Sequence, residues 1–452
     1  MTGPQHARVV VVGGSVAGLA AAAAAAPYAR EVVVVERHPV AAGRTASIVP
    51  QGALPHVLLA GGSAALERLL PGVTADLFLA GAAGDVSGPR PCHWWAFDAV
   101  RDHLPDLGVE VPMASRALVE THLRRRVLAL PNVTMRHGSA TGLGLADTGV
   151  ASLEVDGTTV AADLVVDATG RSGRGADWLT RAGVRVPERE RVVVDVAYTA
   201  VDVERDASDL DGGLLAVVQN DASCPRIGVA LPAEGGRWQV VLGGYFGAAA
   251  EPTYDGMLAF AESLPDPTIA RLLRKPWVGE PRRHRFPASE RTRWDRADLP
   301  AGYVVVGDAV ASFNPIYGQG MSSAAQQAEA LGTLLAGGFD RRTITRRHAR
   351  QARRVVDVPW TVATGADYLY AATSGRRPPG TARINAYLAR VIHRAADDEA
   401  VNVALTRVQN LMARPESLMH PRVLARVLAP GRRPASVRGR RVAPSAPGTA
   451  RP

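Results

Sequence analysis

The chain has 452 residues, enough for two or three domains around a large core. Its two cysteines, Cys92 and Cys224, exclude a disulfide framework and favour a cytoplasmic location. Much of the net charge of +9 lies in residues 431–452, which carry six arginines and no acid and are rich in proline, glycine, serine and alanine. We expect this segment to be a disordered basic tail and "RRR" at 124–126 to be a solvated helix face, so the charge does not indicate a nucleic-acid partner.

The first element is the stretch "VVVVGGSVAGLAAAAAAAPYAREVVVVER" at 9–37. Its first eighteen residues are uncharged, as in a spanning helix or a signal peptide, but glycines interrupt them and a second valine run follows at 32–35. A strand at 9–12, a glycine turn, a helix over 19–26 and a strand at 32–35 explain the whole stretch as a βαβ unit. No other stretch is apolar enough to cross a membrane, so we expect no membrane span.

The glycine turn has the pattern G-x-S-x-x-G, and an acid, Glu36, follows 23 positions after its first glycine. A serine is small enough to let the backbone approach a pyrophosphate, and the positive end of the helix faces that phosphate. The acid can accept hydrogen bonds from a ribose. A glycine turn that serves packing alone is the alternative. The residues predicted to bind a dinucleotide are Gly13, Gly14, Ser15, Val16, Ala17, Gly18, Glu36 and Arg37.

The middle of the chain predicts a second, β-rich unit. Residues 115–128 are expected to form a helix capped by Ser115, and residues 132–170 several strands that end in "DLVVDATGRSG". Residues 190–245 are expected to form an antiparallel sheet, and residues 344–430 are mostly helical in pattern.

A second glycine-rich motif lies at 302–331. A strand leads to Asp308, which can bind a sugar or ribityl hydroxyl at the carboxyl end of the sheet. Pro315 stiffens the loop, and Gly318 and Gly320 let backbone N–H groups approach a flat ring. The helix that follows would stabilise negative charge on a reduced flavin. An ordinary strand–turn–helix with a capping aspartate is the alternative.

The order of "GGSVAG", "VVVVER", "DATGRSG" and "VVVGDAVASFNPIYGQGMSSAA" resembles FAD-dependent monooxygenases of the aromatic hydroxylase and squalene epoxidase type. The segments at 49–62 and 357–370 also resemble flavin epoxidases of polyether antibiotic pathways, such as those of lasalocid and monensin. Where related sequences often carry arginine and histidine, this chain has Ala53 and Leu54. The resemblance implies FAD contacts from the pyrophosphate turn and from Glu36, Arg44, Arg116, Asp308, Gly318, Gly320 and Met321.

The fold implied is an α/β one: a Rossmann-like FAD-binding domain with an inserted antiparallel-sheet substrate domain and a helical C-terminal region. The expected divisions are a discontinuous FAD-binding domain (1–85, 115–180 and 300–345), a substrate domain (86–114 and 181–299), C-terminal helices (346–430) and the tail (431–452).

In this superfamily reduced FAD reacts with molecular oxygen to a C4a-hydroperoxide, which oxygenates an alkene or an electron-rich ring. The resemblance therefore implies epoxidation or hydroxylation of a polyketide-type substrate, with NADPH, NADH or a partner flavin reductase as the reductant. The sequence has no catalytic triad and no spacing typical of a metal site. His56 is a weak candidate for a base, since a packed or flavin-contacting role is commoner. Candidates for the substrate wall, for each of which ordinary sheet packing is the alternative, are Trp94, Trp95, Phe97, Trp238, Tyr245, Phe246 and Phe286.

Three other functions compete with oxygenation. Some relatives in secondary metabolism hold FAD as a structural element and fold a polyene for [4+2] cycloaddition, and Ala53 and Leu54 favour such a non-redox cyclase. A prenyl-chain reductase shares the "DATGR" turn. A flavin halogenase is disfavoured, because that class needs a lysine beside a tunnel and a W-x-W-x-I-P signature that is absent, and the only lysine here is Lys275 in "RLLRKPW".

Overall fold

The computed structural model describes residues 7–39, 56–84, 90–219, 221 and 223–429. Arg44, Ala53, Leu54 and the expected tail at 431–452 lie outside the described residues, as does most of the segment at 49–62.

A five-stranded parallel sheet forms the centre of one half of the molecule, the parallel-sheet half, and the predicted βαβ unit is part of it. Its valines are buried on both faces, which explains why its strands are continuous apolar runs. Val9 and Val11 pack towards the helices, whereas Val10 and Val12 pack towards a separate three-stranded sheet. The strand order is β15 (Tyr303–Val305), β9 (Leu164–Asp167), β1 (Arg8–Val12), β2 (Glu31–Glu36) and β5 (Val133–His137). The three-stranded sheet comprises β6 (Ala140–Ala146), β7 (Gly149–Val155) and β8 (Thr158–Ala161).

Helix α1 (Val16–Ala25) is buried on almost all sides, between the parallel sheet and α8 (Gly320–Ala336). It begins earlier than the predicted 19–26, because Ser15 has extended backbone and is the N-cap. Its alanines let α8 approach closely, and an added Cβ at Gly332 of α8 would lie 3.4 Å from the Cβ of Ala24. The parallel-sheet half therefore has a tightly packed core of small side chains.

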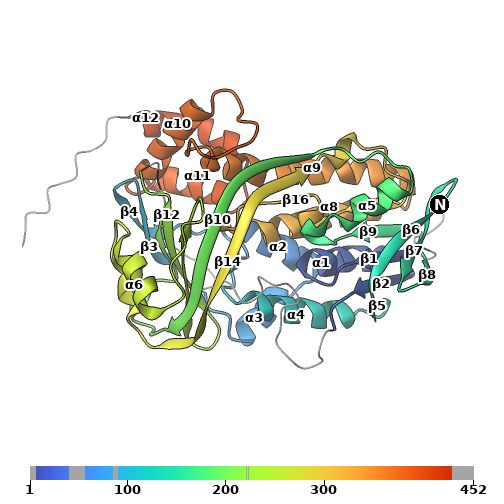
Figure 1. Ribbon diagram of the computed structural model, residues 1–452, viewed down its shortest axis with the longest axis horizontal. Coiled ribbons are helices and arrows are strands. Elements are labelled where there is room, and N and C mark those ends of the chain that lie inside the picture. Colours follow the sequence, from blue (N-terminus) through green and yellow to red (C-terminus); the bar gives the residue numbers. More distant parts are fainter. Residues whose placement is uncertain (1–6, 40–55, 85–89, 220, 222, 430–452) are drawn as a thin grey trace, which may run out of the picture.

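The second sheet has eight strands and is antiparallel except for the pair β11–β3. Its two longest strands, β10 and β14, have sixteen residues each and run from one half of the molecule to the other (Figure 1). The strand order is β16 (Ala311–Ser312), β14 (Trp277–Thr292), β10 (Arg189–Glu204), β13 (Arg237–Gly244), β12 (Arg226–Ala233), β11 (Ala216–Val218), β3 (Arg90–Ala96) and β4 (Ala99–Leu104).

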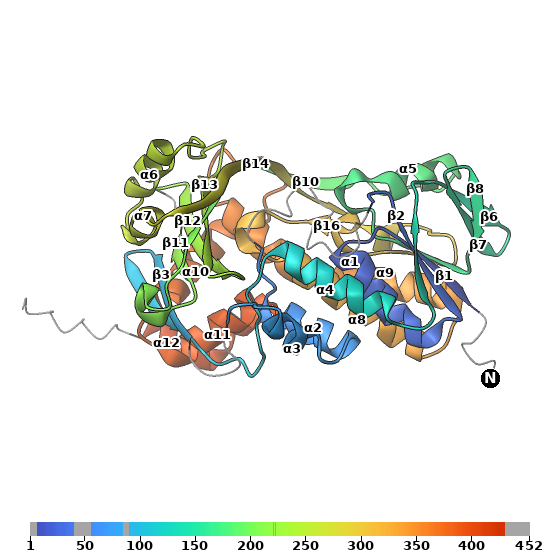
Figure 2. The same cartoon turned by 90° about the horizontal axis from the view of Figure 1, so that it is seen from below.

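The C-terminal part is helical, as the sequence predicts, and its last helices lie beside the second sheet (Figure 2). Within the described residues no helix is both long enough and apolar enough to cross a membrane. The C-terminal helices are α9 (Arg341–Asp367), α10 (Thr381–Arg394), α11 (Glu399–Gln409) and α12 (Pro421–Leu428). The other helices are α2 (Ala60–Leu69), α3 (Val73–Leu79), α4 (Arg116–Leu128), α5 (Arg174–Arg181), α6 (Tyr254–Glu262) and α7 (Thr268–Leu273).

The predicted fold class is confirmed: a Rossmann-like parallel sheet, a mostly antiparallel second sheet and a helical C-terminal region. Ser115 caps α4 as predicted, since its side chain accepts a hydrogen bond from the backbone N–H of Leu118. The solvated face predicted at 124–126 is wrong for Arg124, which is buried, while Arg125 is exposed.

Two glycines inside helices provide a matched test of this packing. An added Cβ at Gly18 would overlap the carbonyl oxygen of Gly13, so α1 would have to move away from the turn, whereas at Gly332 it would make an ordinary contact. We expect Gly18→Ala to lower the free energy of unfolding by about 2 kcal/mol or more, because overpacking displaces backbone. Gly332→Ala should change it by less than about 1 kcal/mol. Thermal or urea unfolding measures both, and equal losses would contradict the packing described.

Candidate functional site

One cavity of about 1330 Å³ extends from the β1–α1 turn to the C-terminal helices. Gly18 does not line this cavity, because it packs against the turn, and Arg44 lies outside the described residues. The remaining predicted site residues all line it: Gly13, Gly14, Ser15, Val16, Ala17, Glu36, Arg37, His56, Arg116, Asp308, Pro315, Gly318, Gly320 and Met321.

The N-terminus of α1 opens into this cavity without a side-chain cap. Ser15 is its N-cap, but the Ser15 hydroxyl donates to Glu120 Oε1 at 2.6 Å instead of accepting from the helix backbone. Arg116 donates to Ser15 Oγ at 3.0 Å and to Glu120 Oε1 at 2.9 Å. The first turn of α1 holds no acid. The backbone N–H groups there are therefore available to an anion, as in known phosphate sites.

Glu36 stands beside the same turn at the end of β2. It is buried, and its two carboxylate oxygens accept from the backbone N–H groups of Gly14 at 2.7 Å and His38 at 2.8 Å. A Cβ at Gly14 would lie 3.1 Å from the Cβ of Glu36, so glycine keeps this approach open. Burial lowers the pKa of Arg124 in α4, while Glu120 and Glu36 oppose the shift. The buried arginine thus balances two carboxylates that flank the turn.

Asp308 follows β15 on a short turn and faces the cavity, where its side chain is exposed. Desolvation by the protein around the cavity raises the pKa of Asp308, whereas the positive charges of Arg116 and Arg171 oppose this shift. The turn is held by the Gly307 N–H, which donates to Gln327 Oε1 at 3.0 Å. Gly307 has a φ of +67°, and a Cβ there would lie 2.6 Å from the Cβ of Ala17. The second glycine motif is thereby packed directly onto the first.

Helix α8 begins at Gly320, beyond Asp308, and its N-terminus also lacks a side-chain cap and an acid. A Cβ at Gly320 would meet only Asp308 Oδ1, at 3.9 Å, so the space in front of it is open. Two positive helix ends, those of α1 and α8, therefore enter one cavity. This arrangement fits a ligand with a pyrophosphate at one position and a flat ring carrying negative charge at another.

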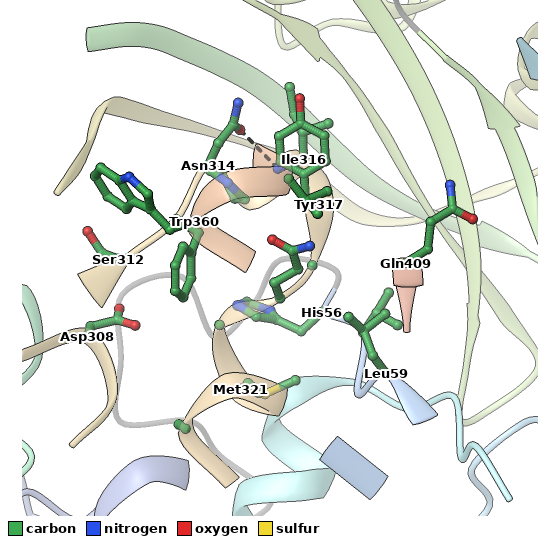
Figure 3. Close-up of a pocket in the computed structure, with 18 of the residues that line it drawn as sticks. His56, Leu59, Asp308, Ser312, Asn314, Ile316, Tyr317, Met321, Trp360 and Gln409 are labelled. Carbon is green, nitrogen blue, oxygen red and sulfur yellow. Dashed lines mark hydrogen bonds between the residues drawn. The ribbon is translucent and has the colours of Figure 1, made fainter. Parts of the chain in front are cut away.

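A buried polar cluster supports the loop between Asp308 and α8, and the sequence did not predict it. The Tyr245 hydroxyl donates to Asp367 Oδ1 at 2.9 Å and lies 2.9 Å from the Tyr317 hydroxyl. Asn314 Nδ2 donates to the same Asp367 oxygen at 2.8 Å. Asn314 and Tyr317 line the cavity (Figure 3). Asp367, the last residue of α9, thus holds the loop in place through its hydrogen bond with Asn314.

Only part of the predicted aromatic wall faces the cavity. Trp94, Phe97 and Phe286 line it. Trp238 is completely buried on the other side of the second sheet, among residues of α6 and α7. The hydrophobic pattern did not distinguish these positions because both faces of the sheet are covered. The candidates that do not line the cavity are Trp95, Trp238, Tyr245 and Phe246.

His56 is held by Arg116, whose Nη1 lies 3.1 Å from His56 Nε2. An arginine only donates, so Nε2 is the acceptor of this bond and its lone pair is engaged. This contact favours the flavin-contacting or packed role over that of a base.

Asp367 offers a test of the buried cluster. Burial raises the pKa of Asp367 to about 7, although Asn314, Tyr245 and Tyr317 oppose the shift. The folded chain therefore binds a proton that the unfolded chain loses near pH 4, so stability should fall as pH rises from about 4 to about 7. Asparagine cannot ionise. The melting temperature of Asp367→Asn should therefore fall less between about pH 5 and pH 8 than that of the wild type. Parallel pH curves for the two proteins would contradict a protonated Asp367.

Comparisons with known proteins agree with this geometry. A profile of the NAD(P)-binding Rossmann-like domain matches residues 11–70, which include the β1–α1 turn and Glu36. Three solved structures share the fold over most of the chain. Flavin-dependent brominase Bmp2 has a TM-score of 0.62 at 15% identity, over 90% of this chain and 94% of its own. HpxO of Klebsiella pneumoniae, complexed with FAD and uric acid, has 0.60 at 17%, over 93% and 97%. Diels-Alderase PyrE3 of the pyrroindomycin pathway has 0.60 at 18%, over 90% and 80%.

At such identities the likeness is one of fold alone. A much closer match exists in sequence. Protein Rv3254 of Mycobacterium tuberculosis is 34% identical over 341 residues, which are 71% of this chain and 71% of that protein. The chain belongs to the same family as protein Rv3254.

Proposed function

We propose that the protein binds FAD in the cavity and transfers an oxygen atom from molecular oxygen to a large, mainly apolar substrate. The observation that carries this proposal is that two different environments lie in one continuous cavity. One end presents two uncapped helix N-termini and Glu36, and the other end is lined largely by aliphatic and aromatic side chains. One ligand with a pyrophosphate and a second, apolar ligand fit these two environments.

The residues predicted from the sequence would each hold one part of the cofactor. The turn from Gly13 to Ala17 would bind the pyrophosphate, Glu36 the adenosine ribose, and Asp308 the ribityl or pyrophosphate end. Pro315, Gly318, Gly320 and Met321 would frame the ring. FAD bound there would supply the activation of molecular oxygen, with NADPH, NADH or a partner flavin reductase as the reductant; one oxygen atom would enter the product and the other would leave as water.

The protein's remaining task would be to exclude water and to position the substrate. The apolar wall serves the first, and the loop held by Tyr245 and Asp367 fixes the surface that the ring would contact. No base is needed to epoxidise an alkene, which agrees with the engaged Nε2 of His56. The resemblance to polyether-pathway epoxidases supports a polyketide-type alkene of bacterial secondary metabolism as the substrate.

The expected domain division fits this proposal with one change. The FAD-binding domain would comprise 1–85, 115–180 and 300–345, except that β16 pairs with β14 of the second sheet. The substrate domain would comprise 86–114 and 181–299, and the helices of 346–430 would close the cavity.

A non-redox cyclase is the second candidate. Its support is the fold shared with the Diels-Alderase PyrE3 and the replacement of arginine and histidine by Ala53 and Leu54. A halogenase has less support, although the brominase Bmp2 shares the fold. Lys275 forms ion pairs with Asp206 and Asp209, and it does not line the cavity.

The cofactor assignment predicts a yellow protein that releases FAD on denaturation. Ser15→Asp places a negative charge at the uncapped end of α1, so we expect a preparation with little or no FAD. Ser208→Asp adds the same charge at an exposed turn and should keep the wild-type FAD content. Absorbance and chromatography of the released flavin measure both. Full FAD occupancy in Ser15→Asp would refute the assignment of the turn.

Labelled oxygen gas separates the two candidate functions. With polyene polyketides as substrates and NADPH or NADH as the reductant, a monooxygenase places one labelled atom in the product, and mass spectrometry detects it. A cyclase forms a product of unchanged mass without oxygen and without reductant. A product of the second kind would overturn the proposed oxygen transfer.

A further inference from the structure

Two glutamine side chains interrupt the apolar part of the cavity. Gln219 follows strand β11 and Gln409 is the last residue of helix α11, and both line the cavity. In Figure 3 Gln409 lies on the opposite side of the drawn pocket from Asp308. Gln409 is therefore placed away from the end proposed to hold the cofactor, and Gln219 is connected to it through Trp94 and Arg101.

The orientation of both carboxamides is fixed by groups that can only donate hydrogen bonds. Trp94 Nε1 donates to Gln219 Oε1 at 3.0 Å. Arg101 donates to Gln409 Oε1 from Nη1 at 3.3 Å and from Nη2 at 3.4 Å. An indole N–H and a guanidinium have no acceptor atom, so a flipped carboxamide would set donor against donor. In each glutamine the oxygen is thus engaged and the Nε2 donor is turned elsewhere.

Neither Nε2 atom donates to another group of the described chain, since the bonds of both side chains are those already given. An amide N–H₂ in apolar surroundings is costly unless it finds an acceptor. Leu104, Leu231 and Ile392 line the same cavity, and their side chains carry no acceptor. A bound molecule can provide the missing acceptor.

Arg101 is an unusual group to have at this place. Its side chain is only 5% exposed, and no carboxylate of the described residues forms an ion pair with it. Its partners are the neutral oxygens of Asn402, Thr406 and Gln409, and its guanidinium lies 4.3 Å from the ring centre of Trp94. Burial lowers the pKa of Arg101 to about 10, so it stays charged near neutrality. A buried cation held by several neutral groups is a rigid support for one of them, Gln409.

We propose that the substrate carries an acceptor-only oxygen, such as a ketone, ester or ether oxygen, and that Gln409 Nε2 donates a hydrogen bond to it. Gln219 Nε2 provides a second donor of the same kind, and Arg101 is a positioning residue that holds Gln409 in the donating orientation. The inference rests on the proposed function only in taking this cavity as the substrate site. It narrows the substrate to an apolar molecule with an oxygen acceptor remote from the reacting carbon.

The test uses two probes of nearly the same shape, 9-fluorenone and fluorene, which differ by one carbonyl oxygen. Equilibrium dialysis against the FAD-loaded protein gives the ratio of their dissociation constants, fluorene over fluorenone. Gln409→Glu keeps the size of the side chain and the partner for Arg101 but replaces the donor with an acceptor. We expect this variant to lower the ratio by about threefold to tenfold, as loss of one hydrogen bond implies. Ile392→Ala, an apolar control, should weaken both probes and leave the ratio unchanged.

Two further variants keep the inference testable if Gln409→Glu folds poorly. Gln219→Glu should lower the ratio in the same sense, and Arg101→Met should lower it without any change to either glutamine. An unchanged ratio in all three variants overturns the proposal, and a decrease in Gln219→Glu alone overturns the role of Gln409 and Arg101. The FAD content of each preparation is measured separately, so a failure of the proposed cofactor site is distinguishable from a failure of this inference.

Discussion

The close approach of helix α1 to its neighbours is the constraint on which the rest of the site depends. Alanine and glycine at the contacts let the helix lie directly against the turn at Gly13, against the turn at Gly307 and against α8. Larger side chains at these positions would separate the elements and move the two helix ends apart. Because the contacts are close, both positive ends and the acid Asp308 face one cavity. The electrostatic character of the site therefore follows from a packing requirement.

The elements and the residues at one end of the candidate site could be predicted from the sequence because their signals are local. A valine run, a glycine turn with a serine and an acid after the next strand all lie within about thirty residues, and the second motif is equally compact. The residues of both motifs lie at helix ends, strand ends and turns, where backbone geometry determines which groups face a ligand. The predicted binding residues of the two motifs that the structure describes line the cavity, with the exception of Gly18, whose contact with Gly13 is itself part of the turn.

The residues that the sequence did not predict depend on contacts between distant segments. Asp367 meets Tyr245 across 122 positions, and Arg101 meets Gln409 across 308. No local pattern marks this carboxylate in a long helix or this arginine in a short strand as buried, and only the assembled fold buries them. The prediction for Arg124 is wrong for the same reason, because α4 places this residue near Glu36 and Glu120. The sequence also does not show which face of a strand lines the cavity when helices cover the opposite face, because both faces are then apolar. Trp238, which packs among residues of α6 and α7, is an example.

The two sixteen-residue strands, β10 and β14, have a consequence for the way in which a substrate reaches the interior. They are paired with each other along most of their length and belong to both halves of the molecule. Two such halves cannot swing apart like the lobes of a hinged enzyme unless this ribbon bends or loses its ladder. Register shifts near Val193 and Ala200 give the ribbon its curvature, but they leave the pairing on either side intact. The ribbon therefore keeps the two halves at a fixed distance, so any opening of the cavity is expected to involve smaller movements than a separation of these halves.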